Sequence, residues 1–199
     1  MNPIDAIDAI KADLRAAMNG VASKAIRESG MGYKLAFGVE LPRLREIAVG
    51  YAADRRLAQA LWQEDIRECK MLAIMLYPHE EFDRDIAALW VESIRPEQAE
   101  LAQLLCMERL STQPYAAEQA FQWMASEREL FQLCGFLTLT RLLMRGAQLS
   151  PAAEREFLDQ AAATLPSPYL PLRKAVHNAL LRYGECSDEA AQQVARIIK

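Results

Sequence analysis

The amino-acid sequence predicts an all-α fold in which pairs of helices stack into a superhelix. Strand signals are nearly absent, because no run of β-branched and aromatic residues alternates with polar ones. Six of the nine prolines stand where the first turn of a helix tolerates a residue without an N–H. From residue 65 onward the predicted helices recur in pairs about every 30–40 residues, a period typical of helical-repeat solenoids.

Prolines and polar caps divide the chain into a series of short helices. Their connections are brief, which makes consecutive helices antiparallel neighbours. One pair is too small to bury its own apolar face, so stacking between pairs must supply the core. We therefore expect residues 1–199 to form a single repeat domain of about six helical pairs. The predicted helices cover residues 3–17, 20–28, 42–52, 54–63, 66–77, 80–93, 96–111, 114–125, 127–145, 151–163, 171–183 and 188–198.

The stretch from Gly30 to Leu76 organises the first half of the chain. A glycine-punctuated, aromatic loop leads to a helix that opens at Pro42. A second helix is introduced by Asp65, and Glu68 follows three residues later, which is the spacing of a capping box. The helical period predicts that Ile66, Cys69, Ala73 and Leu76 are buried. It places Arg67, Glu68 and Lys70 on the opposite, solvated face.

The composition excludes a membrane protein and a secreted one. The longest apolar region, Leu130–Met144, is interrupted by polar residues and is shorter than the roughly 18 residues that a membrane helix needs. Residues 1–17 carry acidic side chains and no apolar core of a signal peptide. We therefore expect a cytoplasmic protein that does not bind a membrane.

Neither a metal nor a cofactor is expected. The four cysteines lie far apart without a histidine partner at metal-ligand spacing. Cys69, Cys106 and Cys134 fall on apolar helical faces, where a free cysteine behaves as a small hydrophobic residue. The sequence also contains no P-loop, dinucleotide-binding, zinc-protease or hydrolase motif.

The distribution of charge is more informative than its total. The formal net charge is −4, which does not by itself indicate a nucleic-acid partner. When alternate helices are grouped, beginning with 42–52, that group is net positive and the remainder of the chain is net negative. Either these charges simply occupy solvated faces, or the positive group lines a mildly basic groove.

The helix at 171–183 supports the groove best. Its helical period places Arg173, Lys174, His177, Asn178 and Arg182 together on one side, where they are able to hold phosphates. The opposite side forms an apolar stripe of Leu172, Ala175, Val176, Ala179, Leu180 and Tyr183.

Two segments resemble a known family. YKLAFGVELPRLREIA followed by ALWQEDIRECKMLAIMLY resembles the opening repeats of the DNA alkylation repair enzyme family, the AlkD-like DNA glycosylases with HEAT-like repeats. LRKAVHNALLRYG resembles the late helix of that family. The resemblance covers about residues 30–185 and implies a C-shaped solenoid whose basic concave surface follows the phosphates of duplex DNA.

The catalytic pattern of that family does not carry over. Its glycosylases have a Trp-Asp-x-x-Asp stretch on the helix that corresponds to 96–111, which here contains no aromatic residue and no aspartate. Depending on register, the acidic position of the family falls on Glu100, the weak catalytic candidate, or on Ala102. Cys134 and Asn178 stand where the family has an arginine and a tryptophan. An alkylated base needs an aromatic surface to stack on and a carboxylate to stabilise the departing sugar cation.

Three functions remain open from the sequence. The leading hypothesis is a diverged member of the family that binds duplex DNA without glycosylase residues. The second is a protein–protein interaction scaffold, for which a solenoid is well suited. The third is an active glycosylase that removes alkylated purines with Glu100. The predicted DNA contacts are Arg43, Arg45, Arg67, Lys70, Arg173, Lys174, His177 and Arg182.

Overall fold

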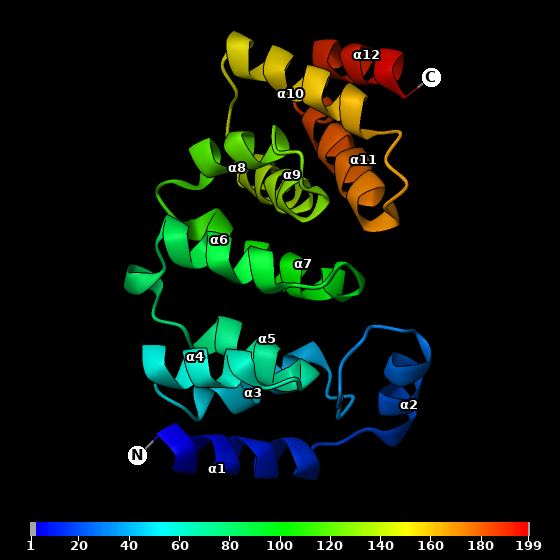
Figure 1. Cartoon of the computed structure of the whole chain (residues 1–199). Helices are drawn as coiled ribbons and strands as arrows, with labels where there is room; N and C mark the ends of the chain where they lie inside the picture. The colour runs from blue at the N-terminus through cyan, green and yellow to red at the C-terminus, as the bar shows by residue number, and fades with distance from the viewer. Residues whose placement is uncertain (1–2, 199) are drawn as a thin grey trace. The chain divides into compact units, whose positions relative to one another are not determined.

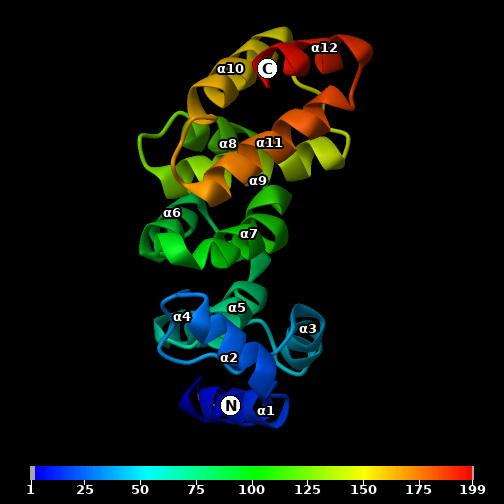
Figure 2. The ribbon, with the colours of Figure 1, turned by 90° about the vertical axis from the view of Figure 1, so that its right-hand side faces the viewer.

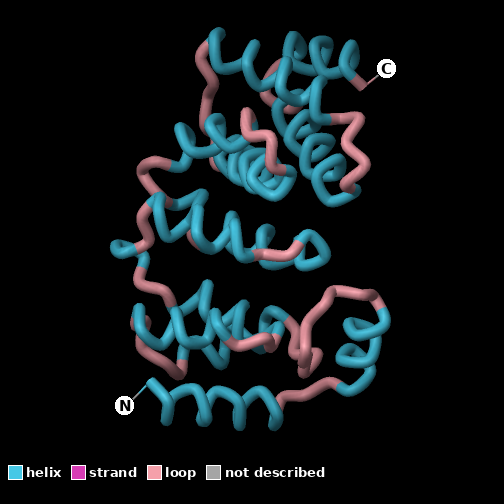
Figure 3. The backbone as a smooth tube through the Cα atoms, viewed as in Figure 1, coloured by secondary structure: helices cyan, strands magenta, loops and turns pink. Residues whose placement is uncertain are grey.

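The computed structural model describes residues 3–198, which are all-helical apart from their connecting loops. Figure 3 shows the helices and loops of this part of the chain without a strand, and the one β-bridge it contains joins Leu35 to Ile66. The fold class predicted from the sequence is confirmed. The α-helices are α1 (Pro3–Ala16), α2 (Gly20–Glu28), α3 (Leu41–Val49), α4 (Arg55–Gln63), α5 (Arg67–Leu76), α6 (Arg84–Ser93), α7 (Ala99–Glu108), α8 (Ala116–Met124), α9 (Glu129–Met144), α10 (Pro151–Thr164), α11 (Leu170–Gly184) and α12 (Asp188–Ile197).

Each predicted helix corresponds to one of these elements (Figure 1). The largest difference is at 96–111, where α7 is shorter than predicted. Two 3-10 turns, Pro96–Gln98 and Leu110–Thr112, flank it. Helix ends often tighten into 3-10 geometry, and local sequence patterns locate them poorly.

The residues group into two compact units. The first contains the chain up to Asp83 together with Arg95–Leu104. The second contains Arg84–Ile94 together with the residues from Leu105 onward. Each unit is described by itself below.

In the first unit α5 is the central helix. It packs against α4 and α3, which lie on either side of it in Figure 2, and α1 packs against α4. Cys69, Ala73 and Leu76 are buried as predicted, whereas Ile66 is half-buried. Burial also raises the pKa of the Cys69 thiol to about 12, which keeps it protonated and consistent with a core position.

In the second unit α9 is the central helix, packed against α8, α11 and α6. Gly135 allows the close approach of α8, because a Cβ atom there would lie 2.7 Å from both the Ala120 oxygen and the Met124 nitrogen. Phe157 joins α10 to its neighbours through ring contacts with Phe136 and Tyr183. Trp90 and Trp123 are buried in this unit, as Trp62 is in the first, and none of the three is presented at the surface.

Glu68 corrects the sequence prediction. It lies not on a solvated face but fully buried, and Ile66, not Asp65, occupies the N-cap of α5 without a side-chain capping bond. The Glu68 carboxylate instead accepts hydrogen bonds from three consecutive backbone N–H groups, those of Phe37, Gly38 and Val39, at 2.9, 2.9 and 3.3 Å. Asp65 and Glu68 have the sequence spacing of a capping box. The Glu68 carboxylate nevertheless accepts from N–H groups of a glycine-containing loop about thirty residues away, which are better donors for it.

The loop at 33–39 is therefore held from two sides. On one side, Leu35 pairs with the start of α5 through its N–H to the Asp65 oxygen and its oxygen to the Arg67 N–H, at 3.2 and 3.0 Å. On the other side, α2 holds it: the Asn19 N–H donates to the Phe37 oxygen at 3.0 Å, and the Ser23 hydroxyl donates to the Ala36 oxygen at 2.6 Å. The loop is thus the connection between α2 and α5.

Among the described helices, none has the length and apolar character needed to cross a membrane.

Candidate nucleic-acid interface

Helix α11 has one apolar face and one basic face. Its buried residues are the six that the helical period predicts: Leu172, Ala175, Val176, Ala179, Leu180 and Tyr183. Pro171 occupies the first turn, where its missing N–H has no cost, and the helix contains no acidic residue. Burial of the apolar stripe leaves Lys174, His177, Asn178 and Arg182 exposed, with Arg173 half-buried at the edge of the face.

The cations of this face differ in how far they are engaged. Lys174 and His177 make no hydrogen bond or ion pair with any described residue. Arg182 donates to both carboxylate oxygens of Glu185 at 3.0 and 2.7 Å, but the pair is exposed and therefore weak. Arg173 donates from Nη1 to the Ser167 oxygen at 3.1 Å, which fixes the turn before α11. Lys174 is thus the cation of this face that is best placed for a new anionic partner.

Arg141 is not among the predicted DNA contacts. It is half-buried on α9, the helix that packs along α11 (Figure 2), and it makes no side-chain hydrogen bond or ion pair in the described structure. The sequence signal was an arginine inside an otherwise apolar helix, which is unusual unless its charge has a partner or reaches water. We include Arg141 in what we call the α11 basic face: Arg141, Arg173, Lys174, His177 and Arg182.

Two other predicted DNA contacts, Arg43 and Arg45, are exposed on α3 in the first unit. Arg43 pairs with Glu46 one turn later at 2.6 Å, and both side chains are more than half exposed. Such a pair contributes little to stability, so Arg43 is available to other anions. The neighbouring glutamate nevertheless lowers the positive potential there.

Arg67 is engaged inside the first unit. Its side chain is only 13% exposed, and it pairs with Glu100 in a bidentate arrangement, Nε to Oε1 and Nη2 to Oε2, both at 2.8 Å. Its Nη1 also donates to the Glu68 carboxylate at 3.2 Å and to the Val39 oxygen at 3.3 Å. Burial alone would lower the pKa of Arg67, but the hydrogen bonds and charge of Glu100 raise it above its ordinary value. The Arg67 guanidinium therefore joins α5, α7 and the loop at Val39 within the first unit, and little of it is exposed to solvent.

Lys70 is also engaged. Its Nζ donates to the Trp62 oxygen at 2.6 Å and lies 4.9 Å from the centre of the Trp62 ring, a cation–π distance. The side chain is half-buried, and this burial lowers the pKa of Lys70. Lys70 therefore closes the end of α4 in the structure described.

Glu100, the weak catalytic candidate, belongs to the same buried network as Arg67. Both of its carboxylate oxygens accept from Arg67, and Oε1 also accepts from the Tyr33 hydroxyl at 2.9 Å. Burial, followed by the charge of Glu100, raises the pKa of Tyr33 well above its ordinary value, so the phenol stays a donor. A carboxylate that is neutralised in this way has little negative potential left for a developing cation.

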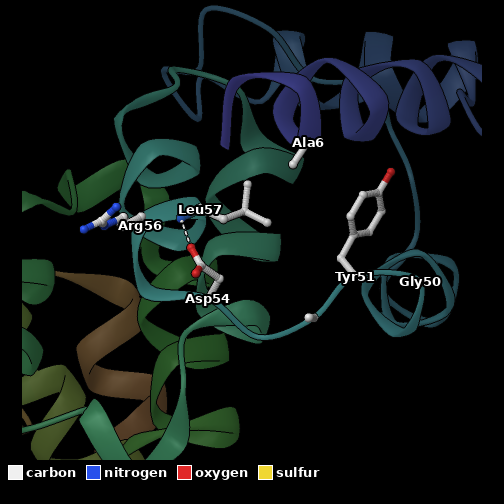
Figure 4. A pocket seen from close by; sticks show the side chains of 7 residues that line it. Ala6, Gly50, Tyr51, Asp54, Arg56 and Leu57 are labelled. Atoms are coloured by element: carbon white, nitrogen blue, oxygen red, sulfur yellow. Dashed lines mark hydrogen bonds between the residues drawn. The ribbon is translucent and has the colours of Figure 1, made fainter. Parts of the chain in front are cut away.

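A hollow of about 390 Å³ lies beside Tyr51 in the first unit (Figure 4). Ala6 and Leu57 form its apolar side, the Asp54 carboxylate caps α4 through the Leu57 N–H, and Arg56 points away from it. The Tyr51 hydroxyl donates to Asp13 at 2.8 Å, and both residues also line a second hollow of about 420 Å³. Neither hollow gathers a nucleophile with a base. No group of His, Cys, Asp and Glu suited to hold a metal ion is found among residues 3–198.

Comparison with known proteins gives two matches. A family model described as "DNA alkylation repair enzyme" matches residues 10–195. A solved structure matches with a TM-score of 0.78 and 20% sequence identity, covering 94% of this chain and 82% of the other. Its protein is described as one of a new family related to the HEAT-like repeat DNA glycosylases with affinity for branched DNA structures. At this identity the second match establishes the fold. The curated proteins include no significant match.

Proposed function

Because the chain belongs to the DNA alkylation repair enzyme family, we propose that it binds duplex DNA, with the α11 basic face as the principal contact. One observation carries this proposal. Helix α11 buries a complete apolar stripe and turns every charged side chain it has, all of them cationic, toward the surface or its edge. The exposed Lys174 has no partner among the described residues.

The dimensions of the face suit a phosphate backbone. From Lys174 to Arg182 the helix rises about 12 Å, and each DNA strand carries one negative charge per about 3.4 Å of helix axis. Several phosphates therefore lie within reach of the face at once. Contacts of this kind position a protein on DNA without reading its sequence. We expect binding that tolerates any sequence and weakens steeply with salt.

Removing the exposed cations of the face tests this proposal. The combined variant Lys174→Glu and Arg182→Gln should weaken binding to a linear duplex by about tenfold or more and lower the slope of log affinity against log salt by roughly two. Fluorescence anisotropy over a series of salt concentrations measures both quantities. The matched control is Arg155→Glu, an exposed cation on α10 in the same unit, which should leave both unchanged. Unchanged affinity in the combined variant would contradict the proposal.

We also propose that binding is not followed by base excision at Glu100. The support is the network around this carboxylate, in which Arg67 and Tyr33 engage its oxygens. Alkylated duplex DNA incubated with excess protein should release no more methylated purine than DNA in buffer. Release that disappears in the Glu100→Gln variant would show the opposite, provided that the variant unfolds at the same temperature as the original chain.

A further inference from the structure

Helix α2 is held to the rest of the first unit by hydrogen bonds to a loop. Ser23 is its one buried side chain, and the helix is held through the loop at 36–38 by the Ser23 and Asn19 hydrogen bonds described above. Gly38 makes this attachment close, since a Cβ atom there would lie 2.4 Å from the Asn19 oxygen and the Ser23 nitrogen. Figure 1 shows α2 connected by this long loop to the part of the unit that contains α3, α4 and α5. Most of the surface of α2 is consequently open.

The open surface combines apolar and cationic side chains. Val21 is 83% exposed and Met18 is 57% exposed, on either side of the exposed N-cap Asn19, whose side chain accepts from the Ala22 N–H. Lys24, Arg27 and Lys34 are exposed nearby in sequence, and residues 18–35 contain a single acidic residue, Glu28. Glu28 is paired with Lys24 only at 3.7 Å with both side chains about two-thirds exposed, so its influence is weak. This segment is positive within a chain whose net charge is negative.

We propose that α2 and its following loop form a second DNA contact that recognises branch points, an inference that rests on the proposed duplex binding. Lys24, Arg27 and Lys34 hold phosphates, and Val21 with Met18 packs against the face of an unstacked base pair. Apolar side chains that enter an intact duplex must first separate stacked bases, at a cost of a few kcal/mol per step. At a junction the terminal base pairs are already exposed, so the same apolar contact is gained at lower cost.

The charge of the segment selects DNA over a second copy of the chain as the occupant. Two copies meeting through this surface would bring like charges together, whereas a phosphate backbone complements them. The affinity for branched DNA described for the structurally similar protein is consistent with this choice. The proposal assigns discrimination between branched and linear DNA to α2 and general affinity to α11.

The experiment compares two equally exposed valines of the first unit. Val21→Ser removes the proposed contact, and Val49→Ser is the matched control, since Val49 is 87% exposed at the end of α3. Anisotropy is measured with the full chain on a three-way junction and on a linear duplex of the same length. Val21→Ser should weaken junction binding about tenfold, as expected for one good contact, and should change duplex binding by less than about twofold. Val49→Ser should change neither.

A second variant tests the cations of this segment separately from the apolar contact of Val21. Lys24→Glu with Lys34→Glu should weaken junction binding more than duplex binding, and Lys24, Lys34 and Val21 are all exposed positions. If Val21→Ser and Val49→Ser bind the junction equally while the α11 variant loses duplex affinity, the α2 inference is wrong and the proposed function stands. If the original chain binds neither DNA, both are wrong. If Val21→Ser changes only self-association in sedimentation, the surface contacts a second copy and the DNA inference is wrong.

Discussion

Replacing Glu68 by alanine is expected to lower the free energy of unfolding by about 3–5 kcal/mol, the range found when one partner of a buried charged network is removed. The carboxylate is the acceptor for the N–H groups of Phe37, Gly38 and Val39 and for Arg67. Without it the three backbone donors lie in a buried site with no acceptor, and each unsatisfied group adds its own desolvation cost. Urea unfolding followed by circular dichroism measures the change.

Two further variants make the Glu68 measurement specific. Glu46→Ala removes a carboxylate that is 64% exposed and paired with Arg43, so it should cost no more than about 1 kcal/mol. Glu68→Gln retains the side-chain volume and one acceptor oxygen, and its stability should lie between those of the original chain and Glu68→Ala. A Glu68→Ala variant as stable as Glu46→Ala would show that the loop does not depend on this carboxylate.

Replacing Gly38 by alanine should destabilise the protein by about 2–5 kcal/mol, because two costs add. The backbone of Gly38 has φ of +74°, a left-handed conformation that costs an alanine about 1–2 kcal/mol. The new methyl group would also lie 2.4 Å from backbone atoms of Asn19 and Ser23, which cannot rotate away as a side chain would. Overpacking of this kind adds about 1–3 kcal/mol.

Gly30→Ala isolates the first of these costs. Gly30 has nearly the same φ, +75°, but no heavy atom lies within 4 Å of its Cβ position. It should therefore lose only the 1–2 kcal/mol of the left-handed backbone. Hydrogen exchange should show faster opening of α2 in Gly38→Ala and not in Gly30→Ala. Equal stability of the two variants would mean that the contact between the loop and α2 is loose enough to accept a methyl group.

The sequence was sufficient to predict which residues are buried where burial follows the helical period. The stripe of α11 was predicted residue by residue, because six apolar positions at helical spacing admit one buried face. The helix starts were located for a similar reason, since Pro42, Pro151 and Pro171 each fit the first turn of their helix.

The sequence was insufficient to predict the environment of a side chain whose partners lie on a distant segment. Glu68 and Arg67 have the spacing of solvated helix residues, but their partners lie on the loop at 37–39 and on α7. No local sequence pattern predicts that three N–H groups of a loop about thirty residues away will donate to the Glu68 carboxylate. Lys70 is similar, since its acceptor is the oxygen of a tryptophan in the preceding helix. The exposure of Lys174, His177 and Arg182 on α11 was predictable for the opposite reason, because it follows from the apolar stripe of the same helix.

The two compact units alternate along the chain, and this limits where the gene can be cut into fragments that fold. The polypeptide leaves the first unit after Asp83, returns to it at Arg95 and leaves again after Leu104. A gene fragment that stops at Asp83 would therefore encode Arg67 and Glu68 but not Glu100, and the Arg67 guanidinium would lose its bidentate carboxylate partner. A cut at Leu104 is no better, because it falls inside α7 and separates α6 from α9, so neither position divides the gene into its two units.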